Sequence, residues 1–247
     1  MEVIAAYSVK GGVGKTTAAV NLAWCAAAAG KRVLLWDLDP QGSATWLLQA
    51  KPKIKGGVDD LLHGDTKVTK SIRPTAIPGI AVLPADEGTW DLDLLVDSVK
   101  KPEQRLSKIL QHLSTDTDVV ILDAPPGASA LGRSVLRAAD VIVVPLHPSA
   151  LSLRALAQVE DVVADVKKAP RILGFFSLVD RRRTAHRDAV ADLPRQDRNI
   201  LPIVVPASVI VERMGQRREP VGAFAPTSEP ARAFEHLWQA ADEAARA

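Results

Sequence analysis

Apolar residues in this chain gather in short runs, and the stretches between these runs carry apolar positions at helical spacing. The runs are rich in valine, isoleucine and leucine and barely alternate with polar residues, which is typical of strands buried on both faces. They predict strands at residues 2–7, 32–36, 80–83, 118–122, 141–145, 172–178 and 201–205. The helical spacing predicts helices at residues 15–29, 58–63, 92–99, 102–113, 132–139, 152–167, 185–193 and 230–245. This order favours an α/β fold, with a doubly wound, mainly parallel sheet flanked by helices.

No feature of the sequence divides the chain into parts. Its 247 residues contain no internal repeat, no low-complexity tract and no long linker. We therefore expect a single domain over residues 1–247. Residues 49–80 are the least regular segment, with several glycines and prolines, and we expect them to cover one edge of the sheet.

Composition narrows the class of protein. Hydrophobic residues make up 47% of the chain and charged residues 24%, as in soluble globular proteins. No run approaches the roughly 18 uncharged apolar residues of a membrane span, and the N-terminus resembles no secretion leader. The single cysteine, Cys25, excludes internal disulfides and any zinc or iron–sulfur site held by several cysteines of one chain. We expect a cytoplasmic protein.

A glycine-rich segment joins the first predicted strand to the first predicted helix. Residues 10–17 read KGGVGKTT, in the order of strand, glycine turn and helix that forms a phosphate-binding loop. Glycines let several backbone N–H groups point at one anion, and the helix N-terminus adds positive potential. Lys15 would then reach the outer phosphates, and the Thr16 hydroxyl would bind Mg²⁺. The general pattern has glycine where this chain has Val9, and this loop contains a second lysine, Lys10.

Carboxylates stand at the ends of two other predicted strands. Asp37 and Asp39 end the second strand, and Asp123 follows the apolar run 118–122. Ligands bind at the carboxyl ends of strands in open parallel sheets, so Asp37 or Asp39 would orient an attacking water or the waters of Mg²⁺. Asp123 matches a Walker B aspartate, whose carboxylate contacts the Mg²⁺ shell. The alternative is that Asp37 and Asp39 only terminate the strand and cap a helix that begins near Ser43.

Together these segments resemble the deviant-Walker ATPases of the ParA/MinD class, whose signature is KGGVGKTT with its extra lysine. The segments DLDPQG (37–42) and DAPPG (123–127) are similar to the second and third motifs of the ParA branch, and the resemblance continues through 143–153 and 225–237. It implies a P-loop fold, ATP and Mg²⁺ as cofactors, and slow, partner-stimulated hydrolysis of ATP. It also implies a homodimer that encloses two ATP molecules, in which Lys10 reaches the phosphates of the partner subunit.

The resemblance also assigns roles to individual residues. Lys10, Lys15 and Asp39 would be catalytic, with Asp39 positioning the hydrolytic water. Thr16, Asp39 and Asp123 would hold the metal, and Pro206 would lie against the adenine. The other nucleotide contacts would come from the loop, which comprises Lys10, Gly11, Gly12, Val13, Gly14, Lys15, Thr16 and Thr17.

Positive charge is concentrated in the last third of the chain. Between residues 181 and 218 there are nine arginines and four acids, and this excess favours a surface for a polyanion. ParA relatives without an N-terminal DNA-binding region bind nonspecific double-stranded DNA through basic residues of this half, and here the first predicted strand begins at residue 2. The candidate DNA contacts are Arg181, Arg182, Arg183, Arg187, Arg217 and Arg218.

The resemblance implies a nucleoid-associated protein that positions a cargo. A ParB-like protein or another cargo adaptor would stimulate hydrolysis, and the cargo would be a plasmid, a chromosome origin, or an assembly such as a carboxysome or chemoreceptor cluster. A MinD-like membrane regulator is the nearest alternative. Acids outnumber the basic residues in the last 15 positions, so we expect no stable membrane association. A metabolic or redox enzyme of the same fold is the second alternative.

Overall fold

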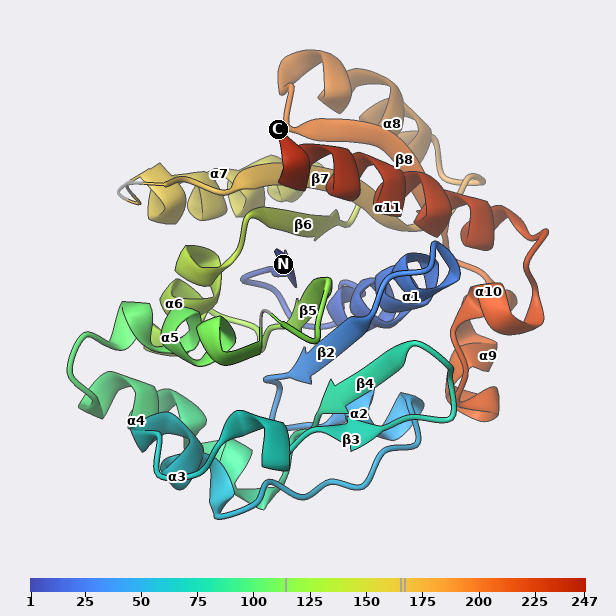
Figure 1. Cartoon of the computed structure of the whole chain (residues 1–247). Helices are drawn as coiled ribbons and strands as arrows, with labels where there is room; N and C mark the ends of the chain where they lie inside the picture. The colour runs from blue at the N-terminus through green and yellow to red at the C-terminus, as the bar shows by residue number, and fades with distance from the viewer. Residues whose placement is uncertain (114, 165, 167) are drawn as a thin grey trace.

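The computed structural model describes residues 1–113, 115–164, 166 and 168–247. Its centre is a sheet with the strand order β3-β4-β2-β5-β1-β6-β7-β8, with helices on both faces (Figure 1). Neighbouring strands are parallel, except that the short β3 pairs antiparallel with β4. The strands are β1 (Glu2–Ala6), β2 (Val33–Asp37), β3 (Arg73–Pro74), β4 (Ile80–Leu83), β5 (Val119–Asp123), β6 (Val141–Leu146), β7 (Arg171–Val179) and β8 (Ile200–Pro206).

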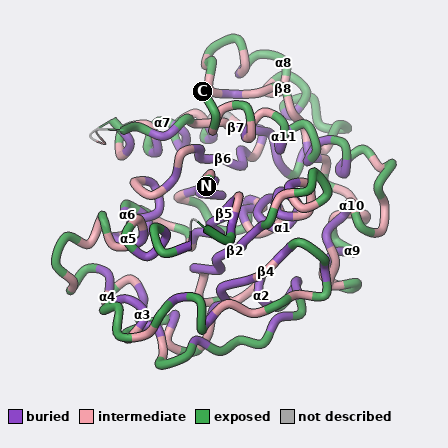
Figure 2. The backbone as a smooth tube through the Cα atoms, in the orientation of Figure 1, coloured by how far each residue is buried: buried purple, intermediate pink, exposed green. Residues whose placement is uncertain are grey.

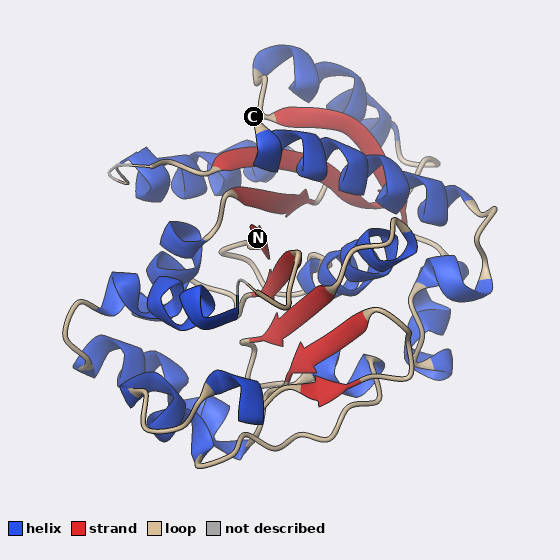
Figure 3. Ribbon diagram, in the orientation of Figure 1, coloured by secondary structure: helices blue, strands red, loops and turns tan. Residues whose placement is uncertain are grey.

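Helices connect the parallel strands and cover the sheet (Figure 3). The α-helices are α1 (Lys15–Ala28), α2 (Ser43–Leu47), α3 (Gly57–His63), α4 (Leu92–Ser98), α5 (Arg105–Leu110), α6 (Ala130–Ala138), α7 (Ala150–Ala164), α8 (Thr184–Gln196), α9 (Val209–Arg217), α10 (Val221–Phe224) and α11 (Glu229–Arg246). Short 3₁₀ turns are η1 (Val68–Lys70), η2 (Glu87–Asp91), η3 (Pro102–Gln104) and η4 (Gln111–Leu113). No helix within the described ranges has both the length and the apolar character needed to cross a membrane.

The sheet separates two apolar cores. Successive residues of a strand point to opposite faces, so Val120 and Leu122 of β5 enter one core while Val119 and Ile121 enter the other. Helices α3 to α8 cover the first face, and α1, α2, α9, α10 and α11 cover the second. Figure 2 shows the buried strands in the interior and exposed backbone around them. Because both faces are covered, the central strands lack the polar alternation of a half-exposed sheet.

The predicted α/β fold with a doubly wound, mainly parallel sheet is confirmed. Each of the seven predicted strands is present with its ends shifted by at most one residue. The sequence left β3 within its irregular segment, and that strand does lie at one edge of the sheet. Part of the predicted end of the helix at 152–167 falls on residues 165 and 167, which lie outside the described residues.

The helix predicted at 102–113 is not continuous. Only α5 is α-helical there, between the 3₁₀ turns η3 and η4, and Lys101 before them has a φ of 60°. Short segments with few intrahelical bonds commonly tighten into 3₁₀ geometry at their ends. The helix near Ser43, expected only in the alternative interpretation of Asp37 and Asp39, is present as α2, whereas the sequence interpretation missed α9 and α10. The signal for α9 was present, because Ser208 caps it by accepting the Ile210 N–H over 3.1 Å.

Candidate functional site

The glycine-rich loop lies between β1 and α1, at the carboxyl edge of the sheet. Gly12 and Gly14 have φ values of 70° and 99°, a region that glycine enters without steric cost. Gly14 precedes α1, and no side chain caps that helix, which leaves its first N–H groups without side-chain acceptors. A β-carbon on Gly11 or Gly12 would meet no atom within 4 Å. The loop is thus an open cradle where backbone N–H groups and a helix N-terminus converge, as an anion requires.

The two lysines of the loop occupy different environments. Lys15 is 6% exposed, and its Nζ donates to the Lys10 carbonyl over 3.4 Å. Burial lowers the pKa of Lys15, whereas the nearby carboxylates of Asp123 and Asp39 raise it. Lys10 is exposed, and its side chain makes no ion pair or hydrogen bond with the described residues. Lys15 therefore serves its own loop, while the charge of Lys10 remains available to another molecule.

Asp123 is a buried carboxylate at the end of β5. It is 0% exposed, and neither of its oxygens has a hydrogen-bond partner among the described residues. Burial raises the pKa of Asp123 well above its ordinary value, and the adjacent Asp37 raises it further. The nearby Thr16 hydroxyl and Lys15 act in the opposite direction. A buried carboxylate without a partner is costly, and a hydrated cation would supply one.

The surroundings of Asp123 fit a nucleotide-bound Mg²⁺. The described residues contain no group of three or more His, Cys, Asp or Glu side chains that could hold a metal. Mg²⁺ rarely uses such a cage, because it keeps several waters and binds through one or two protein groups and substrate phosphates. Here Thr16 would supply the protein ligand beside the cradle, and Asp123 would accept hydrogen bonds from metal-bound water.

The two acids after β2 have different contacts. The Asp37 carboxylate is buried and accepts the Thr45 N–H and hydroxyl, each over 2.7 Å, and the Asp39 N–H over 3.3 Å. These bonds join the end of β2 to α2, so the helix-capping interpretation describes Asp37. Asp39 is half-buried and its Oδ1 accepts the Gln41 N–H over 3.0 Å. Asp39 is also close to Lys15, and its carboxylate can accept further hydrogen bonds. Of the two acids, Asp39 would therefore be the one that orients water beside a bound nucleotide.

Two features of β7 near the loop were not predicted from the sequence. A β-carbon on Gly14 would lie 2.8 Å from the Ser177 Oγ of β7, so the loop leaves no space for a side chain there. The next residue of β7, Leu178, has a φ of 57°, which is strained for a residue other than glycine. Pro206 ends β8 at the same edge, beside Val179 and separated from β1 by β6 and β7.

The buried side-chain amide of Asn21 connects α1 to α9 and α10. Asn21 of α1 is 1% exposed. Its Nδ2 donates to the Thr17 carbonyl over 2.8 Å and to the Met214 sulfur over 3.3 Å, and its Oδ1 accepts the Val221 N–H over 2.8 Å. Asn21 thus fixes α9 and α10 one turn beyond the phosphate cradle.

The first group of candidate DNA-binding arginines follows β7. Arg182 pairs with Asp180, with 2.9 Å between Nε and Oδ1, and Arg181 pairs with Glu229. Arg183 is exposed and makes no ion pair within the described part of the chain. Two of these three arginines therefore already have a carboxylate partner.

The remaining candidates also differ in their contacts. Arg187 of α8 donates to the backbone carbonyls of Arg181 and Arg182, just before that helix, and the Arg217 guanidinium lies 5.1 Å from the centre of the Phe224 ring. Arg218 has a φ of 55°, its Nε and Nη2 donate to the Trp46 carbonyl over 2.9 and 2.6 Å, and its guanidinium lies 4.8 Å from the centre of the Trp46 ring. The contacts of Arg218 join the end of α9 to α2, and none of these three arginines pairs with a carboxylate among the described residues.

Comparisons with known proteins identify the family of this chain. A family model described as "AAA domain" matches residues 1–173. The sporulation initiation inhibitor protein Soj of Bacillus subtilis is 31% identical over 241 residues, which cover 94% of this chain and 95% of that protein. The chromosome-partitioning ATPase Soj of Thermus thermophilus is 35% identical over 240 residues, covering 95% and 92%.

Solved structures agree with the fold and the ligands. Cobyrinic acid a,c-diamide synthase from Mycobacterium smegmatis, with a bound ATP analogue and magnesium, has a TM-score of 0.79 at 28% identity and covers 97% of this chain and 93% of its own. The McdA protein of Cyanothece has a TM-score of 0.82 at 20% identity with 99% of both chains covered, which supports the fold. The chain belongs to the ParA family of P-loop ATPases, enzymes that bind ATP with Mg²⁺.

Proposed function

We propose that this ATPase positions a cargo through a cycle of DNA binding. It would dimerise around ATP and bind nonspecific DNA as a dimer. It would then release the DNA after slow hydrolysis of ATP, which an adaptor protein stimulates. The observation that carries the proposal is the exposed and unpaired Lys10 inside a loop whose other lysine is already buried. Relatives named for chromosome partitioning support the same role.

The electrostatics of two facing loops favour an ATP-dependent dimer. Each γ-phosphate carries more negative charge than Lys15 alone neutralises, and Lys10 of the facing subunit would supply the difference through charge-assisted bonds. Hydrolysis and release of the γ-phosphate remove that attraction, so the dimer would loosen. When bound, Mg²⁺ neutralises charge on the β- and γ-phosphates, while Asp39 would orient the water that attacks.

Dimerisation would give the protein a surface for DNA. Of the six candidate arginines, Arg181 and Arg182 already pair with carboxylates and Arg218 donates to a backbone carbonyl. Two copies would double the number of candidates without a carboxylate partner, such as Arg183 and Arg217. Binding through phosphates would be independent of sequence and sensitive to salt.

Three substitutions test the proposal by nucleotide binding, light scattering and DNA mobility shift. Lys15→Gln should lose ATP binding, dimerisation and DNA binding together. Lys10→Ala should still bind ATP, because Lys15 bonds to the Lys10 backbone carbonyl, but should no longer dimerise with ATP. Asp39→Ala should hold the ATP dimer on DNA with little turnover. Lys53→Ala, at an exposed position away from the loop, is the control.

Several outcomes would contradict the proposal. DNA binding that keeps its normal ATP dependence in Lys15→Gln would break the coupling of nucleotide to DNA. An ATP dimer that forms normally in Lys10→Ala would remove Lys10 from the partner's site. Wild-type turnover in Asp39→Ala would exclude Asp39 from catalysis.

The membrane alternative is disfavoured by the packing of α11. Its apolar face carries Phe234, Leu237 and Trp238, all buried, and it packs on α1 and β8. An interfacial helix must keep such a face free for lipid. Sedimentation of the ATP-bound protein with anionic liposomes, without any shift of nonspecific DNA, would favour the membrane function instead. A ligase product from a cobalamin-pathway substrate would favour a metabolic function.

A further inference from the structure

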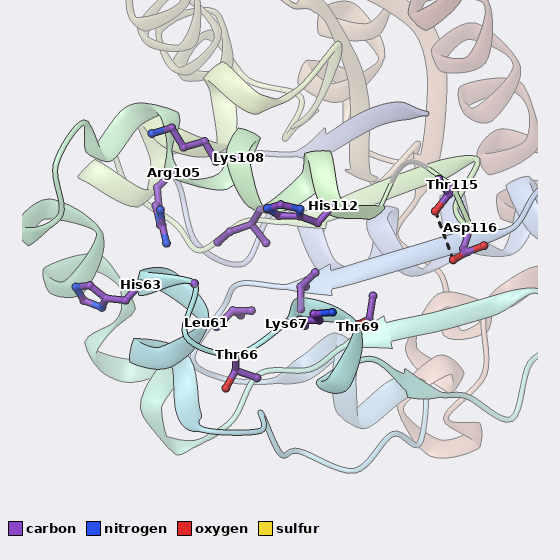
Figure 4. Close-up of a pocket in the computed structure, with 13 residues that line it drawn as sticks. Leu61, His63, Thr66, Lys67, Thr69, Arg105, Lys108, His112, Thr115 and Asp116 are labelled. Carbon is purple, nitrogen blue, oxygen red and sulfur yellow. Dashed lines mark hydrogen bonds between the residues drawn. The ribbon is translucent and has the colours of Figure 1, made fainter.

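A cavity lies among the helices that cover one face of the sheet. It has a volume of about 670 Å³ and opens between the end of α3 with η1 on one side and α5 with η4 on the other (Figure 4). None of the residues that line it belongs to the phosphate loop, and Asp37, Asp39 and Asp123 are not among them. A ligand in this cavity would therefore bind apart from the nucleotide.

The lining of the cavity combines an apolar floor with positive charge. Leu61, Val68 and Ile109 are buried and contribute the floor. In Figure 4, Arg105 extends from the upper wall and Lys67 lies on the lower wall, so both cations line the same cavity from opposite sides. Cavities of roughly 300–1,000 Å³ with an apolar lining and a few convergent polar groups are typical of small-molecule sites.

The cations of this cavity have no anionic partner in the described residues. Neither Arg105, Lys67 nor the neighbouring Lys108 makes an ion pair or side-chain hydrogen bond there. The Arg105 Nε is buried and has no acceptor, although a buried donor of this kind normally has one. Asp116 is the one acid among the lining residues, and it lies with Thr115 at the far end of the cavity in Figure 4.

The position of Arg105 also has a purely structural explanation. A β-carbon on Gly64 would lie 3.7 Å from Arg105 Nη2, so this guanidinium stands at the C-terminal end of α3, where a helix favours a cation. That contact accounts for one end of the guanidinium. It does not supply an acceptor for Nε, and Lys67 on the opposite wall also has no ion pair among the described residues.

From this geometry we propose that the cavity binds a small organic anion, whose phosphate or carboxylate contacts Arg105 and Lys67 and whose apolar body lies on Leu61, Val68 and Ile109. The phosphate and carboxylate forms share this chemistry, because Arg and Lys bind both. The site shares no residue with the phosphate cradle, so it is separate from the function proposed above.

Binding of phenyl phosphate, measured by calorimetry, tests the proposal. Saturating Mg²⁺ and ADP keep the phosphate cradle occupied, and benzoate, inorganic phosphate and phenol replace the probe in turn. Phenyl phosphate or benzoate should bind with a stoichiometry of one. Inorganic phosphate should bind at least tenfold more weakly because it lacks the apolar body, and phenol should bind at least tenfold more weakly because it lacks the anion.

Substitutions locate the binding. The double variant Lys67→Gln with Arg105→Gln should weaken the bound anion at least tenfold, and Lys67→Gln alone, at an exposed position that does not threaten folding, should weaken it several-fold. The matched controls Lys53→Gln and Lys55→Gln, both exposed and outside the cavity, should leave it unchanged. Unchanged affinity in the Lys67 variants, or no saturable binding of either organic anion, would overturn the proposal. An equal loss of nonspecific DNA binding in the double variant would reassign these cations to DNA.

Discussion

Replacing Asp123 with asparagine should stabilise the protein without nucleotide and metal while impairing its response to them. The carboxylate is fully buried and unpartnered, and an unsatisfied buried polar group costs about 1–3 kcal/mol, more if charged. Lys15 loses a nearby countercharge in the variant, which places the expected gain near the low end, about 1–1.5 kcal/mol. For a chain of this size that gain raises the Tm by about 2–6 °C.

The pH dependence of this gain follows from the raised pKa of Asp123. The folded protein holds the proton more firmly than the unfolded chain, so ionisation costs stability as the pH rises from the unfolded value, about 3.9, through the raised folded value. The advantage of Asp123→Asn should therefore be present at pH 8 and shrink as the pH falls toward about 4. Thermal unfolding followed by circular dichroism at several pH values, without nucleotide or Mg²⁺, measures it.

A neighbouring acid provides the control. Asp37→Asn loses strong acceptor positions for Thr45 and should destabilise the protein by about 1 kcal/mol or more. With Mg²⁺ and ATP present, the wild type should become more stable than Asp123→Asn. Ligand binding stabilises the wild type, and the variant largely loses that binding. Should Asp123→Asn prove as destabilising as Asp37→Asn in the absence of ligands, the carboxylate has a partner and the reasoning is wrong.

Three further substitutions test contacts around the cradle. Gly14→Ala should destabilise by about 1–3 kcal/mol, because φ is 99° and the new carbon meets the Ser177 hydroxyl; thermal unfolding measures this, and adding Ser177→Ala should recover only the steric part. Asn21→Ala should cost about 2–4 kcal/mol in urea unfolding, because the α10 backbone N–H that it satisfies becomes unpaired; an effect below about 0.5 kcal/mol would contradict this. Arg218→Ala should change the fluorescence of Trp46 and lower the free energy of unfolding by about 1 kcal/mol, with little change in DNA affinity. A large fall in DNA affinity at unchanged stability would instead make Arg218 a DNA contact.

The parts of this protein that the sequence predicts are those set by local patterns. The strand ends follow from apolar runs, and the glycine loop follows from residues that adjoin one another in the chain, as Gly12 and Gly14 show by their positive φ values. The roles of Asp37 and Asp39 were not separable in this way. The difference depends on Thr45, which lies eight residues after Asp37 and donates to Asp37 through its N–H and its hydroxyl.

The arginines show why charge counts in a sequence do not define a surface. The excess of nine arginines over four acids between residues 181 and 218 is partly cancelled by groups just outside that segment. Asp180 pairs with Arg182, and Glu229 pairs with Arg181 from the start of α11. Arg218 is held by a backbone carbonyl of α2, far away in the chain.

The same tertiary contacts indicate which arginines remain without a carboxylate partner. Arg183 and Arg217 keep their charge without a carboxylate partner in the described chain, so a contact with DNA phosphate would cost them no existing ion pair. Arg181 and Arg182 would first have to exchange a carboxylate partner for a DNA phosphate. At exposed positions the net free energy of that exchange is close to zero. Loss of Arg183 or Arg217 should therefore reduce the salt dependence of DNA binding more than loss of Arg181 or Arg182, a ranking that the sequence could not supply.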